Sequence, residues 1–289
     1  MSALAIRRRT KGSRLWDAGP LTRVALLGAL VLSTFPIYWM LVIATRTNAD
    51  AVDVPPPLLP SGNLGDNVSR LFATEDAHFV KGLFNSLIVA STVTVSVVAL
   101  STLAGFAFAK LRFRGSKVLL VTVLISMMVP LQQMGVVPLY IMMVRLGWTG
   151  QLQAVILPFL VNGFGVFLMR QYTLQAVPDE LIEAARVDGA STLRIYWSVV
   201  LPALRPAMAV LGLFTFMQNW NEFMWPLIVL NDGDLYTLPV ALASLSREHV
   251  QDTELMMAGA VVTVLPVLLL FLALQRYYMQ GLLMGSLKG

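Results

Sequence analysis

Six long apolar windows alternate with short polar segments along the 289 residues of the chain. A helix needs about 20 apolar residues to cross the hydrocarbon core of a bilayer, and each window comes close to that length. The expected membrane-spanning cores are Val24 to Ala44, Leu83 to Ala109, Val118 to Tyr140, Leu152 to Met169, Ala207 to Leu230 and Leu255 to Leu274. Pro130, Gln132, Gln133 and Pro138 interrupt the third window. The pattern predicts an all-α integral membrane protein with six transmembrane helices, whose membrane domain covers residues 24–274.

Composition agrees with this pattern, because 57% of the residues are hydrophobic and only 13% are charged. The net charge of +5 is concentrated beside the apolar windows, so it indicates membrane topology and not nucleic-acid binding. The chain has no cysteine, which excludes disulfides and thiolate metal sites. Its two histidines, His78 and His249, stand alone, and we expect no metal site.

Lysine and arginine collect on one side of the expected membrane, and short basic loops stay on the cytoplasmic side. These residues lie before the first window, between the second and third, and after the sixth: Arg7, Arg8, Arg9, Lys11, Arg14, Arg23, Lys110, Arg112, Arg114, Lys117, Arg276 and Lys288. We therefore expect a basic cytoplasmic N-terminus at 1–23, a cytoplasmic loop at 170–205 and a cytoplasmic tail at 275–289.

The loop at 170–205 carries its own helix signals. Pro178 suits a first helical turn, and Leu181, Ile182 and Ala185 are expected to form one apolar face of that helix. Gly189 suits a left-handed C-terminal cap. The signals of a second helix follow, with Ser191 as its cap, Leu193 to Val200 as its body and Pro202 as its end. Two short helices with a sharp bend between them are predicted.

The same loop resembles the signature of permease subunits of binding-protein-dependent ABC importers. The matching residues are Glu183, Ala184, Ala185, Gly189, Val199, Leu201 and Pro202, with Val199 in place of the usual isoleucine. The resemblance implies a coupling helix between spans four and five that contacts a separate ATPase subunit. The implied contact residues are Glu183, Ala184, Ala185, Asp188, Gly189, Ala190 and Arg194. Without this resemblance, a helical hairpin that supports the membrane interface is the simpler interpretation.

The fifth window holds an unusual polar run from Gln218 to Glu222, followed by Trp225 and by Thr237-Leu238-Pro239. This region resembles the maltose-type permeases that import carbohydrates. Amides and a carboxylate inside an apolar span are costly unless they face protein or a water-filled path, and amides and indoles suit sugars. The candidate substrate path consists of Gln132, Gln133, Asn162, Gln218, Asn219, Asn221 and Glu222. Hydrogen bonding between subunits is the alternative, and Glu222 could instead couple protons in a secondary transporter.

The C-terminal segment also resembles the tail of maltose-type permeases. In that family the tail contacts the ATPase subunits, which carries over to Gly285, Ser286, Leu287, Lys288 and Gly289. Met284 departs from the small residue often found at its position. A frayed basic end is the alternative interpretation.

No glycine-rich loop that could cradle a phosphate is present in the sequence, so we expect no ATPase activity in this chain and no cofactor bound to it. The resemblance implies that ATP and magnesium bind to partner subunits. It implies a second homologous permease, two ATP-binding subunits, an extracytoplasmic sugar-binding protein and a prokaryotic inner membrane with its lipid. A proton-driven transporter, a channel and an intramembrane enzyme remain as alternatives.

Overall fold

The computed structural model describes residues 19–47, 50, 58–74, 78–128, 135–248 and 252–286, and every regular element in these ranges is a helix. The first half holds α1 (Pro20–Ala44), α3 (Leu64–Ala73), α4 (Phe79–Lys110), α5 (Ser116–Met128), α7 (Val136–Leu146), α8 (Leu152–Ile156) and η2 (Leu157–Phe159). The second half holds α9 (Gly163–Ala176), α10 (Asp179–Val187), α11 (Thr192–Ile195), η3 (Tyr196–Val200), α12 (Leu201–Ala203), α13 (Arg205–Trp220), α14 (Met224–Val229), η4 (Gly233–Leu235), α15 (Leu238–Glu248) and α16 (Thr253–Ser286).

Four helices in the described ranges are long and apolar enough to cross a membrane: α1, α4, the run Leu152–Ala176 and the apolar part of α16. They match the first, second, fourth and sixth windows within a few residues. The fifth window, Ala207 to Leu230, covers most of α13 and all of α14. The helix α13 and the helical segment before it, Thr192–Ala203, form a pair that is bent by 75° at the junction. The structure therefore confirms an all-helical membrane protein, with four spans, or five if the bent pair is one span.

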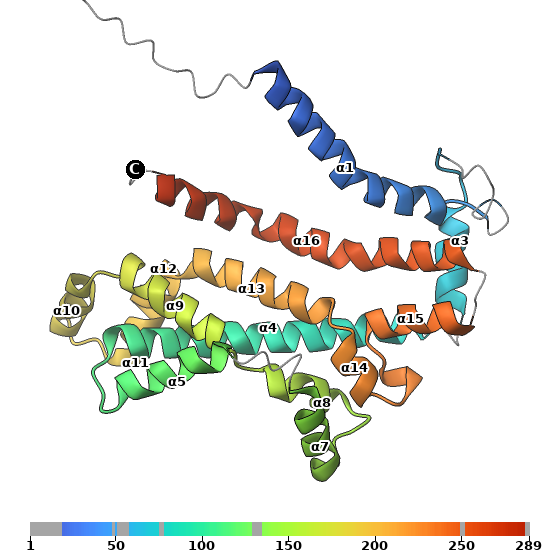
Figure 1. Ribbon diagram of the computed structural model, residues 1–289. Coiled ribbons are helices and arrows are strands. Elements are labelled where there is room, and N and C mark those ends of the chain that lie inside the picture. The colour runs from blue at the N-terminus through green and yellow to red at the C-terminus, as the bar shows by residue number, and fades with distance from the viewer. Residues whose placement is uncertain are drawn as a thin grey trace, which may run out of the picture.

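The third window is not one helix in the described residues. It consists of α5 and α7, with 13 and 11 residues, and each is too short to cross the hydrocarbon core alone. Pro130, Gln132 and Gln133 lie outside the described residues. Pro138 lies in the first turn of α7, where a proline costs little because its missing N–H would have no helical partner. The helix α5 packs against α9, whereas α7 projects with α8 in Figure 1.

The helix α4 is the centre of the fold and packs against α8, α9, α13 and α15. Gly105 lies at its crossing with α9, where a Cβ atom would come within 2.7 Å of the Cβ of Met169 and 2.8 Å of the backbone nitrogen of Arg170. Small residues at helix crossings allow the backbones to approach closely in membranes. Gly105 therefore sets how tightly α4 and α9 meet.

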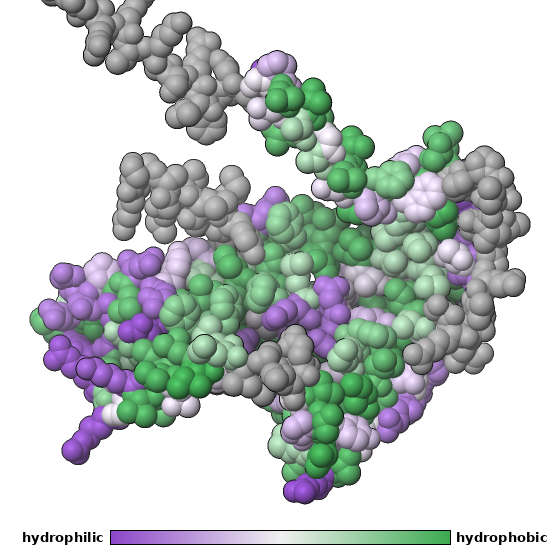
Figure 2. Space-filling view, viewed as in Figure 1, coloured by the Kyte–Doolittle hydropathy of each residue, from purple (hydrophilic) through white to green (hydrophobic). Residues whose placement is uncertain are grey.

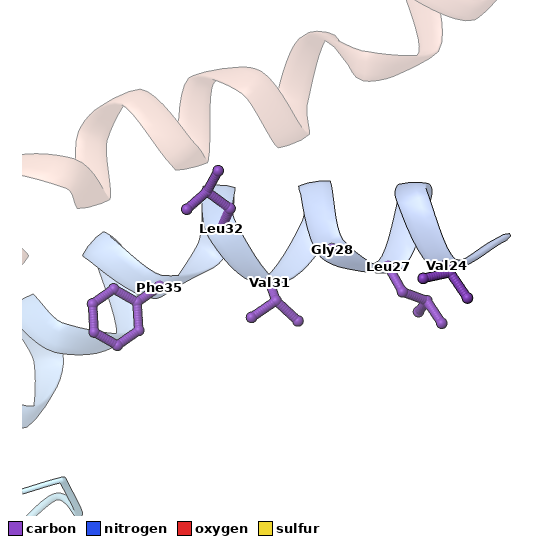
Figure 3. A pocket seen from close by; sticks show the side chains of 6 residues that line it. All are labelled: Val24, Leu27, Gly28, Val31, Leu32 and Phe35. Carbon is purple, nitrogen blue, oxygen red and sulfur yellow. The ribbon is translucent and has the colours of Figure 1, made fainter. Parts of the chain in front are cut away.

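The first half of α1 stands apart from this core. It diverges from α16 in Figure 1. Pro36 lies inside α1, and a proline inside a helix is a common cause of a bend. Figure 3 shows an apolar hollow on this arm, lined by Val24, Leu27, Gly28, Val31, Leu32 and Phe35. Only Val42, Ile43 and Ala44 of α1 are buried. An apolar arm of this kind is typical of a helix covered by lipid or by another subunit.

Candidate functional site

The bend of the loop at 170–205 has the geometry that its sequence predicts. Gly189 has φ +76°, and its Cβ position is open, so glycine is required by the backbone and not by packing. The N–H of Ala190 donates to the carbonyl of Ala185 at 2.9 Å, and the N–H of Gly189 donates to the carbonyl of Arg186 at 3.0 Å. This pair of bonds is a Schellman cap. It ends α10 and turns the chain sharply.

The helix after the bend begins as predicted and ends later. The Ser191 hydroxyl accepts the N–H of Arg194 at 3.3 Å and caps the helix. Pro202 was expected to end it, but the helix continues through the π segment η3 to Ala203. The wide turn of η3 directly precedes Pro202, and such a turn is one way for a helix to accommodate a proline. The sharp bend falls after Ala203, at the start of α13.

An apolar cluster attaches this loop to the end of α4. Ile182, Ile195 and Tyr196 are buried beside Phe106 and Val177. The hydroxyls of Tyr196 and buried Thr102 of α4 are 2.8 Å apart, and the rings of Tyr196 and Phe106 are 5.7 Å apart between centroids. The loop is therefore seated on the membrane core through side chains of both its helices.

One ion pair joins the start of α10 to the last residue of α4. Lys110 Nζ lies 2.6 Å from Asp179 Oδ1, and the lysine side chain is only 5% exposed whereas the aspartate is 78% exposed. The hydrogen bond from Lys110, its charge and that of Arg112 hold the pKa of Asp179 below the usual range.

The outer face of the loop presents large apolar side chains with no cover. Leu181 is 51% exposed, Val187 87%, Leu193 62% and Trp197 61%. The predicted apolar face of α10 is thus wrong for Leu181, because the helix buries Ile182 instead. Glu183, Ala184, Asp188, Gly189 and Arg194 are exposed, while Ala185 and Ala190 are half-buried against the cluster. Figure 1 shows α10 at the far end of the molecule, and Figure 2 shows that hydrophilic atoms surround the apolar ones there.

The polar run of the fifth window lies where α13 stops. The sequence predicts an unbroken span to Leu230, but α13 ends at Trp220 and α14 begins at Met224. The Trp220 ring is buried, and its Nε1 donates to the carbonyl of Thr263 in α16 at 3.1 Å. Irregular backbone at membrane depth occurs only where it is buried in protein or lines a water-filled cavity.

Local hydrogen bonds occupy several of the candidate path residues. The Nδ2 atoms of Asn219 and Asn221 each donate at 2.8 Å to a carbonyl four residues earlier. Glu222 Oε1 accepts the N–H of Trp225 at 3.1 Å, and Asn162 Oδ1 accepts the N–H of Gly165 at 2.6 Å. Glu222 and Asn162 therefore stabilise the starts of α14 and α9.

Gln218 and Asn221 lie on the exposed side of α13, whereas Asn219 is half-buried. Phe214, one turn before Gln218, is exposed and contacts Phe164 of α9, with ring centroids 5.6 Å apart and the rings tilted by 50°. This contact places the start of α9, with Asn162, beside the exposed face of α13. The sequence analysis did not identify either phenylalanine, because both look like core residues in the sequence. Only their exposed contact in the fold distinguishes them from such residues. Gln132 and Gln133 lie outside the described residues.

The C-terminal segment continues α16 as a helix through Ser286, and thus includes Gly285. Leu287, Lys288 and Gly289 lie outside the described residues. Among the residues that the structure describes, no group of three or more histidine, aspartate or glutamate side chains could hold a metal ion.

These features define a multi-pass helical membrane protein with a protruding polar loop and a broken span. Residues 98–283 match the family described as binding-protein-dependent transport system inner membrane component, and the chain belongs to this family. The chain is therefore a transport component of an ABC importer that works in a complex with other subunits. ATP hydrolysis lies in separate subunits of such systems, and the proton-coupled alternative has no support.

Several relatives are similar over nearly the whole chain. AraQ of Bacillus subtilis (strain 168), an arabinooligosaccharides transport system permease protein, is 34% identical over 265 residues, 90% of this chain and 92% of AraQ. LacG of Rhizobium radiobacter, a lactose transport system permease protein, is 33% identical over 260 residues, 90% of this chain and 93% of LacG.

UgpE of Yersinia enterocolitica, an sn-glycerol-3-phosphate transport system permease protein, is 29% identical over 265 residues, 90% of this chain and 94% of UgpE. The fold is similar to a chain in the crystal structure of a bacterial ABC transporter involved in the import of the acidic polysaccharide alginate. The TM-score is 0.77 at 22% sequence identity, over 89% of this chain and 95% of that one.

Proposed function

We propose that the chain is a permease subunit of an importer for a sugar or oligosaccharide. The names of AraQ and LacG support this class of substrate. So does the exposed surface where Gln218 and Asn221 lie beside Phe214, because amides bind hydroxyls and an aromatic ring covers the apolar face of a sugar. In this proposal the surface is half of the translocation path, and a second homologous permease supplies the other half.

The exposed face of α10 and α11 is the proposed contact for the ATPase subunits, and this face is the observation that carries the proposed function. Apolar side chains at the tip of a cytoplasmic loop are costly in water unless a partner covers them. Glu183, Asp188 and Arg194 surround them with charges that can select that partner. In this proposal the tail residues Gly285 to Gly289 contact the same subunits.

The proposed complex contains two ATP-binding subunits, which hold ATP and magnesium, and an extracytoplasmic sugar-binding protein. Both termini and the loop at 170–205 face the cytoplasm in this arrangement, because the basic residues collect there. ATP binding would close the ATPases and draw the two coupling helices together. The cavity would then open outward to receive the sugar.

Replacement of Glu183 in the reconstituted complex tests the proposal. Glu183→Ala should uncouple ATP hydrolysis from sugar uptake, because it removes one charge from a contact whose partner charge stays in place, at a cost on the order of 2 to 5 kcal/mol. Glu180→Ala is the matched control, since Glu180 is an exposed carboxylate on the same helix. Uptake of radiolabelled sugar and ATPase activity are measured together in liposomes. Equal coupling in both variants would disprove the proposed contact.

A further inference from the structure

A groove on the membrane surface of the protein lies apart from the translocation surface. It is bounded by α4, α13 and α16 and has a volume of about 480 Å³. Its walls are mostly apolar, with Val95 and Val98 from α4, Met208 from α13 and Leu270 and Leu274 from α16. One end of the groove lies at Arg205, the first residue of α13, directly after the loop at 170–205.

The length of the groove matches one leaflet of a bilayer. It extends along α13 from Arg205 to Phe216, which corresponds to about 16 Å of helix. Half of a hydrocarbon core of about 30 Å is about 15 Å. Gly212, about midway along, faces Val98 and Thr94 of α4. In the proposed orientation, a groove of this length that starts at Arg205 spans about the cytoplasmic leaflet.

The open end of the groove carries a positive charge. Arg205 belongs to the lining and is exposed. In the part of the chain that the structure describes, no carboxylate forms an ion pair with it. Basic pockets between transmembrane helices on the cytoplasmic side bind anionic lipid headgroups. Arg205 is placed to contact a phosphate while the groove holds the attached chain.

The size of the groove suits an acyl chain. A volume of about 480 Å³ along about 16 Å of helix gives room for an extended hydrocarbon chain, which is far thinner than a helix about 10 to 12 Å across. We propose that this groove binds an anionic phospholipid of the cytoplasmic leaflet, with its phosphate on Arg205 and one acyl chain between α4, α13 and α16.

The purified transporter complex offers a direct test by native mass spectrometry in mixed phosphatidylglycerol and phosphatidylcholine. Arg205→Gln should lower retained phosphatidylglycerol about fivefold, the factor that one arginine near an anionic surface contributes, and leave phosphatidylcholine unchanged. Gly212→Leu should reduce both lipids, because its side chain enters the groove and a Cβ there makes only ordinary contacts at 3.7 and 3.8 Å. Arg114→Gln, an exposed arginine far from the groove in sequence, should behave as the wild type.

The leaflet depends on the proposed orientation, but lipid retention is measured without transport, so failed sugar uptake would not decide this test. Equal phosphatidylglycerol retention in Arg205→Gln and Arg114→Gln would overturn the site. A cross-link from Ala209→Cys in the groove to a second permease, with no labelling of α13 by a photoactivatable phosphatidylglycerol, would also overturn it and assign the groove to protein.

Discussion

The two ends of α4 hold their neighbouring loops in different ways. At the N-terminal end, which is the outer end in the proposed orientation, the Asn85 amide donates to the carbonyls of Asp234 and Tyr236 at 2.9 and 3.0 Å. The buried Ser86 hydroxyl accepts the N–H of Leu238 at 2.8 Å. At the C-terminal end, which is the cytoplasmic end in that orientation, side-chain tips and apolar packing attach the loop at 170–205, through Tyr196 and the pair of Lys110 with Asp179.

The difference indicates which end can transmit motion. Buried bonds to a backbone leave polar groups unpaired when they break, which costs about 1 to 3 kcal/mol for each group, so the outer loop is fixed to α4. Apolar contacts are not directional, and the two polar contacts between the loop and α4, Tyr196 with Thr102 and Asp179 with Lys110, join side chains and not backbone groups. The cytoplasmic loop can therefore shift against α4 more easily than the outer loop can. We infer that the outer end is a scaffold and that the cytoplasmic end is the moving contact.

Asn85→Leu should have the largest effect on stability. The carbonyls of Asp234 and Tyr236 would lose their donor inside the protein, at a cost on the order of 2 to 5 kcal/mol. Ser86→Ala removes one acceptor and should cost about 1 kcal/mol. Thermal unfolding of the purified complex in detergent measures both. If Asn85→Leu unfolds at the wild-type temperature, the outer end is not fixed by these bonds.

Gly189→Val should have the second-largest effect, and this effect should be on coupling at the opposite end of α4. Its φ of +76° penalises a β-branched residue by about 1 to 3 kcal/mol, which would redirect α11. Gly189→Asn should lose less, because asparagine tolerates the left-handed conformation. Sugar-stimulated ATPase activity of the reconstituted complex compares the two. Equal activity would show that the bend does not position the contact.

The ion pair between Lys110 and Asp179 should give a smaller and asymmetric effect. Asp179→Ala leaves Lys110, only 5% exposed, without its partner, whereas Lys110→Ala leaves a solvated aspartate. Coupling should therefore fall further in Asp179→Ala, and a double-mutant cycle measures the difference. Equal losses in the two single variants would contradict a directional role for Lys110.

The pKa of Asp179 determines how the contribution of the same ion pair changes with pH. Lys110 holds the pKa of Asp179 below its ordinary value of 3.8, so the folded state binds this proton less readily than the unfolded chain. The contribution of the pair is present above that value and is lost as pH falls through the lowered pKa. Coupling should thus keep its dependence on Asp179 between pH 7 and 5.

Local chemistry made the cytoplasmic bend predictable from sequence. Gly189 and Ser191 each determine the conformation of their own position and the next few residues, so no distant contact is needed. The end of the second helix was mispredicted at Pro202, because the π segment before it depends on how Tyr196 and Val200 pack against α4. The expectation that a proline ends a helix takes no account of that packing.

Faces of helices were harder to predict than the helices themselves. Leu181 and Ile182 are adjacent and both apolar, but successive residues of a helix point about 100° apart. Contact with α4 therefore determines that Ile182 is the one that is buried. Asn219 and Asn221 flank Trp220 in the sequence, and the direction in which Trp220 is buried determines how exposed each asparagine is. The third window raises the same difficulty, since α5 packs against α9 and α7 packs against α14, and the sequence pattern does not contain these contacts.

Protection of a single cysteine tests most directly whether the exposed face of α10 contacts the ATPase. The chain has no cysteine, so Val187→Cys would introduce one thiol at a position that is 87% exposed, with Arg114→Cys as a cytoplasmic control. Labelling by a membrane-impermeant maleimide is compared in the permease alone and in the assembled complex. We predict that assembly protects position 187 and leaves position 114 reactive. Equal labelling of position 187 with and without the ATPase subunits would contradict the proposed contact.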